Sequence, residues 1–294
     1  MTNGLKSSNT KWILFLASIG QPEDRHVNDL AFGLYCLEDA GISADDISIY
    51  IDGPDRSLLS SLIAVGSQHG YVIKETPDFF ADLNNNSAKN IVLFVTGHGS
   101  IHGISAALPI KPYTLVNAIK GAPGLNQAVV YLGQCYAGIF NYVMVGSKGK
   151  GDPCVILAGA TNLHSSLSSA TTEQLLGRPL AWQANLFLLH AFKWITSPID
   201  VDGDGLTTVM DSFKYAGAMS NDDNKYLKSI YTYRIPSLHE NYESARKKFE
   251  ETKDPSDELM MKAQDTNYSR ALDILHTHQE SWILNSIPAQ LIEF

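Results

Sequence analysis

The chain has 294 residues, of which 44% are hydrophobic and 18% charged, a balance that fits one large globular domain or a domain with an appendage. Its formal net charge of −9 argues against nucleic acid or an anionic membrane as a main partner, because phosphate groups are bound by clustered basic side chains. The apolar runs are far shorter than the roughly 20 residues of a membrane span, and the polar start MTNGLKSSNT predicts a flexible tail over residues 1–10, not a signal peptide.

Hydrophobic spacing predicts strands alternating with helices through the first two thirds of the chain. Strands are expected over residues 11–19, 46–51, 90–95, 127–132 and 153–158. Helices are expected over residues 28–40, 57–68, 76–83, 113–120 and 180–194. The alternation predicts an α/β fold with a mostly parallel sheet flanked by helices, over residues 11–222.

After about Asp222, charged helices replace the strand-like runs. Ser237 and Glu240 fit a capping box, and Asp254 followed by Pro255 fits a helix start, so helices are expected over 237–251 and 255–276. Residues 223–294 are therefore interpreted as a helical extension packed on the core, with a surface to which a protein partner could bind.

The segment IVLFVTGHGSIHG places His98 between two glycines, just after five consecutive apolar residues. The apolar run, residues 91–95, is typical of a strand buried on both faces. Open α/β sheets place their ligands at the carboxyl ends of the strands, so His98 is a candidate functional residue. An ordinary strand-ending turn with an incidental histidine is the alternative.

The next predicted strand runs into YLGQCYAGIF, which carries Cys135 in a second glycine-punctuated turn. Cysteine becomes a nucleophile near neutral pH when a base or cation lies close to it. If the two strands are neighbours, their tips lie side by side, and the pattern predicts a Cys135/His98 dyad. Cys135 by itself would more often be a buried apolar residue; the pair of strand ends favours catalysis.

The GHGS and GQCYAG motifs resemble those of the caspase-like fold of cysteine peptidases, which includes caspases, metacaspases, legumains and gingipains. The nearest resemblance is to legumain-type and bacterial caspase-like peptidases, and it covers residues 11–218. It implies an endopeptidase that cleaves a protein or peptide through an acyl-enzyme intermediate, without a cofactor for the chemistry. It assigns His98 and Cys135 to the dyad, and the backbone N–H groups of Gly99 and Cys135 to the oxyanion hole.

Two departures from the family leave the substrate preference open. Metacaspases and gingipains carry an aspartate before the cysteine, which favours a basic residue at the cleavage position, whereas this chain has Gln134. The arginines of the caspase pocket have no clear counterpart here. Beside Gln134, the candidate pocket residues are Ser165, Ser166 and Ser168, which fall where this fold builds a wall of the specificity pocket.

Other histidines and cysteines compete for these roles. His102, four residues past His98, is a rival base, and His164 is either a pocket residue or a surface-loop histidine. Cys36 and Cys154 are interpreted as structural. Three cysteines without paired spacing predict neither a disulfide framework nor a zinc motif, which favours the cytoplasm.

The segment DVDGDGLTTVMD has the oxygen-ligand spacing of an EF-hand-like calcium loop. Its candidate ligands are Asp200, Asp202, Asp204, the backbone carbonyl of Leu206, and Asp211. Position 12 is aspartate where EF-hands have a bidentate glutamate, and similar loops recur in bacterial caspase-like peptidases. The alternative is an Asp/Gly turn that leads into a helix capped by Thr207 or Thr208.

Two other functions compete with the peptidase. A glutamine amidotransferase also has its nucleophile in a Gly-x-Cys-x-Gly turn and takes its histidine from a His-x-Glu pair, which His278 and Glu280 supply. Ala137, however, replaces the second glycine, and the pair lies in the charged helical part of the chain. An inactive caspase-like scaffold that binds partners through its C-terminal helices is the other alternative.

Overall fold

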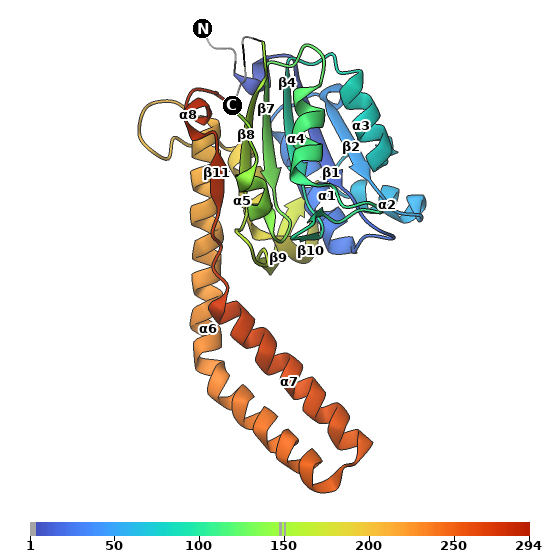
Figure 1. Ribbon diagram of the computed structural model, residues 1–294, viewed down its shortest axis with the longest axis vertical. Coiled ribbons are helices and arrows are strands. Elements are labelled where there is room, and N and C mark those ends of the chain that lie inside the picture. Colours follow the sequence, from blue (N-terminus) through green and yellow to red (C-terminus); the bar gives the residue numbers. More distant parts are fainter. Residues whose placement is uncertain (1–3, 147–148, 150) are drawn as a thin grey trace. The chain divides into compact units, whose positions relative to one another are not determined.

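The computed structural model describes residues 4–146, 149 and 151–294. Within this part of the chain, the central sheet has seven strands in the order β11-β8-β7-β4-β1-β2-β3 (Figure 1). Their bounds are β1 (Thr10–Leu16), β2 (Ile47–Ile51), β3 (Ile73–Lys74), β4 (Asn90–Val95), β7 (Gln127–Leu132), β8 (Cys154–Gly159) and β11 (Trp282–Leu284). Six strands are parallel and β11 is antiparallel to β8, which confirms the predicted α/β fold with a mostly parallel sheet.

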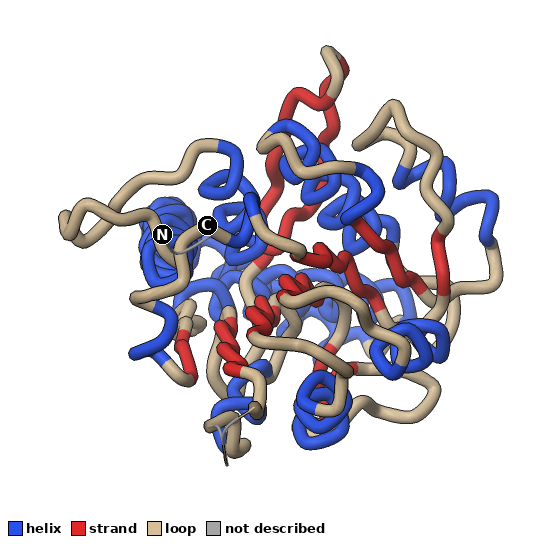
Figure 2. The backbone as a smooth tube through the Cα atoms, turned by 90° about the horizontal axis from the view of Figure 1, so that it is seen from above, coloured by secondary structure: helices blue, strands red, loops and turns tan. Residues whose placement is uncertain are grey.

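Helices cover both faces of this sheet, which is why its central strands are continuous apolar runs (Figure 2). One apolar layer packs under α1 (Asp24–Asp39), α2 (Arg56–Ile63) and α5 (Leu186–Thr196). The opposite layer packs under α3 (Thr76–Asn84) and α4 (Pro112–Lys120). All six residues of β4 are buried, as a strand between two helical layers requires.

The predicted helix over residues 180–194 is wrong in its first half. Residues Arg178–Asn185 form the strand β10, which pairs with β9 (Ser168–Leu175) in an antiparallel hairpin, and helix α5 begins only at Leu186. Leu176 and Gly177 turn the hairpin with positive φ angles of 51° and 77°, as a two-residue turn between antiparallel strands requires. Cross-strand pairing therefore overrides the helical spacing of the apolar residues.

Several short elements complete the first half of the chain. They are the 3-10 helices η1 (Leu5–Ser7) and η2 (Ala44–Asp46), and the two-residue strands β5 (Gly99–Ser100) and β6 (Gly103–Ile104), which pair just after His98. The predicted flexible tail over residues 1–10 does not hold for residues 4–10, the part of that segment that the structure describes. Leu5 is fully buried, and Thr10 already belongs to β1.

The chain divides into two compact units, 1–220 with 279–294, and 221–278. Residues 279–294 thus belong with the sheet, where β11 pairs with β8 and is followed by α8 (Ser286–Ala289), although the sequence assigned all of 223–294 to a helical extension. The 3-10 helix η3 (Ala137–Tyr142) follows the Cys135 turn in the first unit. None of the described helices is both long and apolar enough to span a lipid bilayer.

The second unit consists of the greater part of helix α6 (Val209–Thr252), from residue 221 onward, and of helix α7 (Pro255–His276). Helix α6 is continuous past residue 237, where the sequence predicted a helix start, and α7 matches its predicted bounds. The Ser237 hydroxyl donates to the Arg234 carbonyl inside α6 instead of capping a new helix. Tyr268 of α7 stacks on Tyr242 of α6 with 6.0 Å between ring centroids, and such contacts support α6 past its internal proline.

Candidate active site

The His98 and Cys135 loops leave the same end of two neighbouring parallel strands. Strands β4 and β7 are in register to their last residues, Val95 opposite Leu132. The Gly133 amide then donates to the Val95 carbonyl at 2.8 Å, which carries the pairing one step further. The expected side-by-side placement of the two strand ends is therefore present.

The two loops also touch through their backbones. A Cβ atom placed on Gly99 would lie 2.2 Å from the Cys135 carbonyl oxygen and 2.6 Å from Gln134 Cγ, so that only glycine fits there. Gly97 has a φ of 103°, a conformation that other residues rarely adopt. The two glycines around His98 thus have distinct uses: Gly97 turns the chain, and Gly99 lets the His98 loop rest on the Cys135 loop.

The Cys135 thiol is half-buried and lies against the loop that follows β8. Its Sγ accepts a hydrogen bond from the Ser166 amide at 3.3 Å. The next residue, Tyr136, has a positive φ of 56° and donates its amide hydrogen to the His164 carbonyl at 2.8 Å. No hydrogen bond joins the thiol to the His98 imidazole among the described residues, which is common for catalytic pairs before substrate binds.

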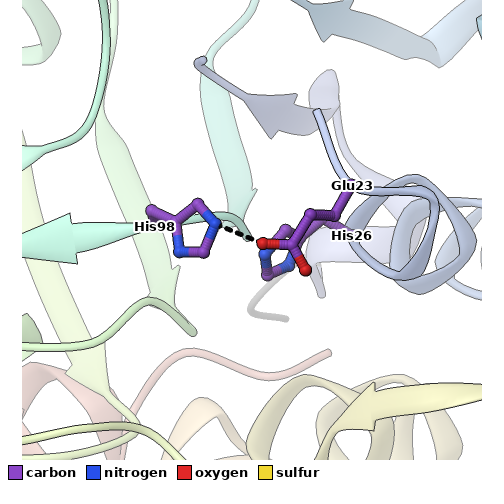
Figure 3. Close-up of side chains that lie close together, drawn as sticks. All are labelled: Glu23, His26 and His98. Atoms are coloured by element: carbon purple, nitrogen blue, oxygen red, sulfur yellow. Dashed lines mark hydrogen bonds and ion pairs between the residues drawn. The ribbon is translucent and has the colours of Figure 1, made fainter. Parts of the chain in front are cut away.

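Glu23, which the sequence analysis did not identify, holds the His98 imidazole. It precedes helix α1, and its Oε1 lies 2.7 Å from His98 Nε2 (Figure 3). Its other oxygen accepts a 2.6 Å hydrogen bond from Arg25 Nε, and this bond, with that of His98, lowers the pKa of Glu23 to about 2. The pairing therefore contributes stability above the ordinary pKa of 4.5 and loses it as the pH falls through about 2.

Behind this pair lies His26, on the first turn of α1. Its ring meets the His98 ring edge-on, with 5.0 Å between centroids, and only 5% of the residue is exposed (Figure 3). His26 Nδ1 lies 3.5 Å from the Thr96 hydroxyl and 3.8 Å from Asp29 Oδ2, whereas Nε2 has no hydrogen-bond partner among the residues that the structure describes. His98 is thus packed against a buried imidazole whose polar contacts with described residues are made through Nδ1.

The buried Asp29 carboxylate accepts hydrogen bonds from residues in two other parts of the site. It accepts hydrogen bonds from the Thr96 hydroxyl at 2.9 Å, from the Trp182 indole at 2.9 Å and from the Asn185 amide at 3.0 Å. These donors come from the end of β4 and from β10, so one carboxylate joins the His98 strand and the β9–β10 hairpin to α1.

Asn185 makes the matching connection to the Cys135 turn. Its Nδ2 donates to the Gly133 carbonyl at 2.6 Å and to the Ser166 hydroxyl at 3.1 Å. Its Oδ1 accepts from the Leu188 amide and so caps helix α5. Asn185 therefore fixes the turn before Cys135 relative to the loop that carries Ser166.

The predicted pocket residues are near Cys135 but differ in their contacts. Ser166 reaches the thiol through its amide, and the Ser168 hydroxyl lies 3.4 Å from Arg25 Nη1. The Ser165 carbonyl contacts His164 Nδ1 at 3.0 Å. Gln134 is 2% exposed, and its side-chain amide has no hydrogen-bond partner in the described part of the chain.

The two backbone N–H groups of the expected oxyanion hole lie on the touching loops. The Cys135 amide donates no hydrogen bond to any described residue. Gly99 begins the short strand β5, beside the Cys135 carbonyl. Both loops thus bring a backbone amide to the same strand-end region as the thiol.

The rival residues make other contacts. His102 is exposed, on the turn between β5 and β6, and His164 lies 3.6 Å from Glu280. His278 belongs to the second unit, with Nδ1 3.2 Å from Lys228 Nζ. The two residues of the amidotransferase His-x-Glu pair therefore contact different partners: His278 contacts Lys228, and Glu280 contacts His164.

The other two thiols are unsuited to a nucleophilic role. Burial raises the pKa of Cys36 well above its ordinary value, and burial also raises the pKa of Cys154, whose sulfur receives a 3.5 Å contact from Asn285. A raised pKa keeps a thiol neutral, and the neutral form is the poor nucleophile.

The acidic loop over residues 200–211 brings three of its predicted ligands together. Carboxylate oxygens of Asp200, Asp202 and Asp204 lie within 4.8 Å of one another. Asp202 also pairs with Lys214 Nζ at 2.6 Å, and the two oxygens of Asp200 accept from the amides of residues 203 and 205. Leu206 and Asp211 do not belong to this side-chain cluster.

Asp211 instead organises the start of α6. It is fully buried, and its Oδ2 accepts from the amide and the hydroxyl of Thr208 at 2.9 and 2.8 Å. Its Oδ1 accepts from the amides of Val201 and Asp202 at 2.8 and 3.4 Å. The Asp211 carboxylate is thus occupied by hydrogen bonds across the base of the loop.

An apolar pocket of about 930 Å³ lies beside the site, at the carboxyl ends of β1, β2 and β3. It includes Ser18 to Gly20, which come shortly before Glu23, and Ala106 to Lys111, which follow the β5–β6 turn. Ile19, Leu108 and Tyr113 expose apolar surface there. The His98 carbonyl accepts from the Ser105 amide, which connects the wall of the pocket to the His98 loop.

Comparison of the sequence with protein-family models gives no match, and a search of curated proteins gives no similar protein. The function of the site is therefore inferred from its geometry.

Proposed function

We propose that the protein is a cysteine endopeptidase in which Cys135 is the nucleophile, His98 the base and Glu23 the residue that orients His98. The observation that carries this proposal is the contact of the His98 and Cys135 loops at Gly99, on neighbouring parallel strands. The same arrangement supports the resemblance to caspase-like peptidases, because their two motifs likewise follow successive strands.

The first step transfers the thiol proton to His98. The Glu23 carboxylate accepts the hydrogen on His98 Nε2. The other nitrogen, Nδ1, therefore has the free lone pair that takes the Cys135 proton. The Glu23 carboxylate stabilises the imidazolium that forms, because opposite charges 2.7 Å apart attract. The thiolate then attacks the carbonyl carbon of the scissile peptide bond.

The second step expels the amine and leaves an acyl-enzyme. The carbonyl oxygen gains negative charge in the tetrahedral intermediate and takes hydrogen bonds from the amides of Cys135 and Gly99. His98 returns its proton to the leaving nitrogen, and the carbon–nitrogen bond breaks. His98 then takes a proton from water, whose oxygen attacks the thioester carbonyl carbon. The carbon–sulfur bond breaks, the acid is released, and His98 returns the proton to the Cys135 thiolate.

The surroundings of the thiol favour an uncharged residue before the scissile bond. Gln134 is neutral, and the adjacent Ser165, Ser166 and Ser168 offer small polar groups without charge. We expect a peptide library to be cleaved after uncharged polar or small residues, with apolar residues accepted elsewhere by the neighbouring pocket. Cleavage almost solely after arginine or lysine would contradict this expectation.

Calcium has a structural role in this proposal, at Asp200, Asp202 and Asp204, since a thiolate nucleophile requires no metal-activated water. The compartment that we propose is the cytoplasm, supported by three cysteines that form no disulfide in the structure. The negative net charge favours protein or peptide substrates over nucleic acid.

A thiol-reactive peptidyl probe tests the proposal together with the peptide library. The probe should label the wild type once, at Cys135, and the same labelling should persist in Cys154→Ala, whose thiol is also half-buried but lies away from His98. The Cys135→Ala variant should be neither labelled nor active. A protein that cleaves no peptide and reacts equally well at Cys154 would favour the inactive scaffold.

A further inference from the structure

We propose that Glu23, His26 and His98 form a zinc-binding site that inhibits the enzyme. One ligand atom from each residue can be chosen so that all three lie within 4.8 Å of one another. Figure 3 shows the three side chains converging from α1 and from the loop after β4. The inhibitory consequence rests on the proposed function, whereas binding of the metal does not.

The buried ligand, His26, is the strongest indication. His26 is 5% exposed, and within the described part of the chain its Nε2 has no hydrogen-bond partner, although leaving a buried polar atom unpaired costs free energy. The other nitrogen, Nδ1, faces Asp29 Oδ2 at 3.8 Å and the Thr96 hydroxyl at 3.5 Å. Metal-binding histidines characteristically have a carboxylate behind the nitrogen that does not bind the metal.

The backbone holds two of the ligands in place before any metal binds. The His26 amide donates to the Glu23 carbonyl at 3.0 Å, so that both side chains leave the same first turn of α1. His26 then meets the His98 ring edge-on at 5.0 Å. Little conformational entropy is therefore lost when the three side chains gather around an ion.

The donor set fits zinc. Two imidazoles and one carboxylate are common ligands of this ion, which binds them at about 2.0–2.2 Å in a tetrahedron, with donors about 3.3 Å apart. Glu23 Oε1 and His98 Nε2 are 2.7 Å apart, so the two need to separate by less than about 1 Å to admit an ion at that donor spacing. Both side chains are about half exposed, which leaves them room to do so.

Zinc at this site would remove the catalytic base. With Nε2 of His98 bound to the metal, the neutral imidazole keeps its hydrogen on Nδ1 and has no lone pair left for the Cys135 proton. Glu23 is bound to the metal at the same time and no longer supports an imidazolium. Inhibition should therefore be reversed fully by a chelator, which leaves both side chains chemically unchanged.

Calorimetry with zinc chloride on Cys135→Ala protein tests the site without the thiol as a possible ligand. We expect one equivalent to bind, with an affinity at least about 100-fold weaker in the double variant Cys135→Ala/His26→Ala. The control Cys135→Ala/His102→Ala removes a nearby exposed histidine and should bind as tightly as Cys135→Ala. A second control, Asp202→Ala/Asp204→Ala on the same background, separates this site from the acidic loop.

Cobalt(II) provides a second readout, because its visible absorption reports the coordination geometry. Cys135→Ala should give the spectrum of a tetrahedral nitrogen and oxygen site, and Glu23→Gln on the same background should weaken it even if His26→Ala fails to fold. Absence of binding at micromolar zinc, or binding unaffected by both His26→Ala and Glu23→Gln, would overturn the site. Zinc binding without peptidase activity in the wild type would refute the proposed function alone, and activity insensitive to zinc would refute only the inhibition.

Discussion

Replacing Glu23 by glutamine removes the charge opposite His98 but keeps an oxygen that can accept the Nε2 hydrogen bond. At the observed 2.7 Å, a carboxylate and an imidazolium attract by about 1.5 kcal/mol at the dielectric constant of water and by about 6 kcal/mol at an effective value of 20. The side chains of His98 and Glu23 are 56% and 52% exposed, so the lower figure applies. About 1.5 kcal/mol corresponds to a roughly tenfold lower kcat.

Glu23→Ala removes the charge and the orienting hydrogen bond together, and a charge-assisted hydrogen bond contributes about 1.5–3 kcal/mol in all, so we expect kcat to fall roughly 10- to 150-fold. KM should change little in either variant, because Glu23 acts through His98 and not on the substrate. The assay is steady-state cleavage of a peptide selected from the library, with a chelator present so that bound zinc does not contribute.

Glu280→Gln is the matched control, because Glu280 pairs with His164 at 3.6 Å on the other side of the Cys135 turn. Its kcat should stay within about twofold of the wild type, as expected for an exposed ion pair. A Glu23→Gln variant with unchanged kcat would refute the orienting role. A raised KM at constant kcat would instead show that Glu23 binds substrate.

Three further predictions concern the proposed dyad, the Asn185 side chain and the acidic loop over residues 200–211. Cys135→Ala and His98→Ala should each abolish peptide hydrolysis while leaving the circular dichroism spectrum unchanged. The double variant should be no less active than either single variant, since nucleophile and base act as a unit. Turnover retained in His98→Ala would show that another residue is the base. Asn185→Ala should lower the free energy of unfolding by about 2–4 kcal/mol in a denaturant titration, because it removes a helix cap and leaves a buried carbonyl without its donor; a loss below about 1 kcal/mol would show that other groups replace these bonds. Millimolar calcium should raise Tm, and Asp202→Ala/Asp204→Ala should remove this shift while Cys135 still reacts with the probe; calorimetry without calcium binding would leave the acidic loop as a capped turn.

The sequence by itself determined five strands of the sheet, β1, β2, β4, β7 and β8, and the position of both predicted catalytic loops. Buried parallel strands need long apolar runs, so residues 90–95 and 127–132 could be identified from local composition alone. The glycines on either side of His98 also indicated a turn there, because a positive φ and a close backbone approach both select glycine. These features depend on a few neighbouring residues, and local pattern therefore predicts them.

Only the tertiary structure decided which side chains surround His98. Glu23 reaches it across 75 positions of sequence, and Asp29 meets Trp182 and Asn185 across more than 150. Antiparallel pairing with β9 likewise made residues 180–185 a strand where a helix was expected. No local spacing encodes such contacts, because their energy comes from hydrogen bonds and burial that exist only once distant segments have packed together.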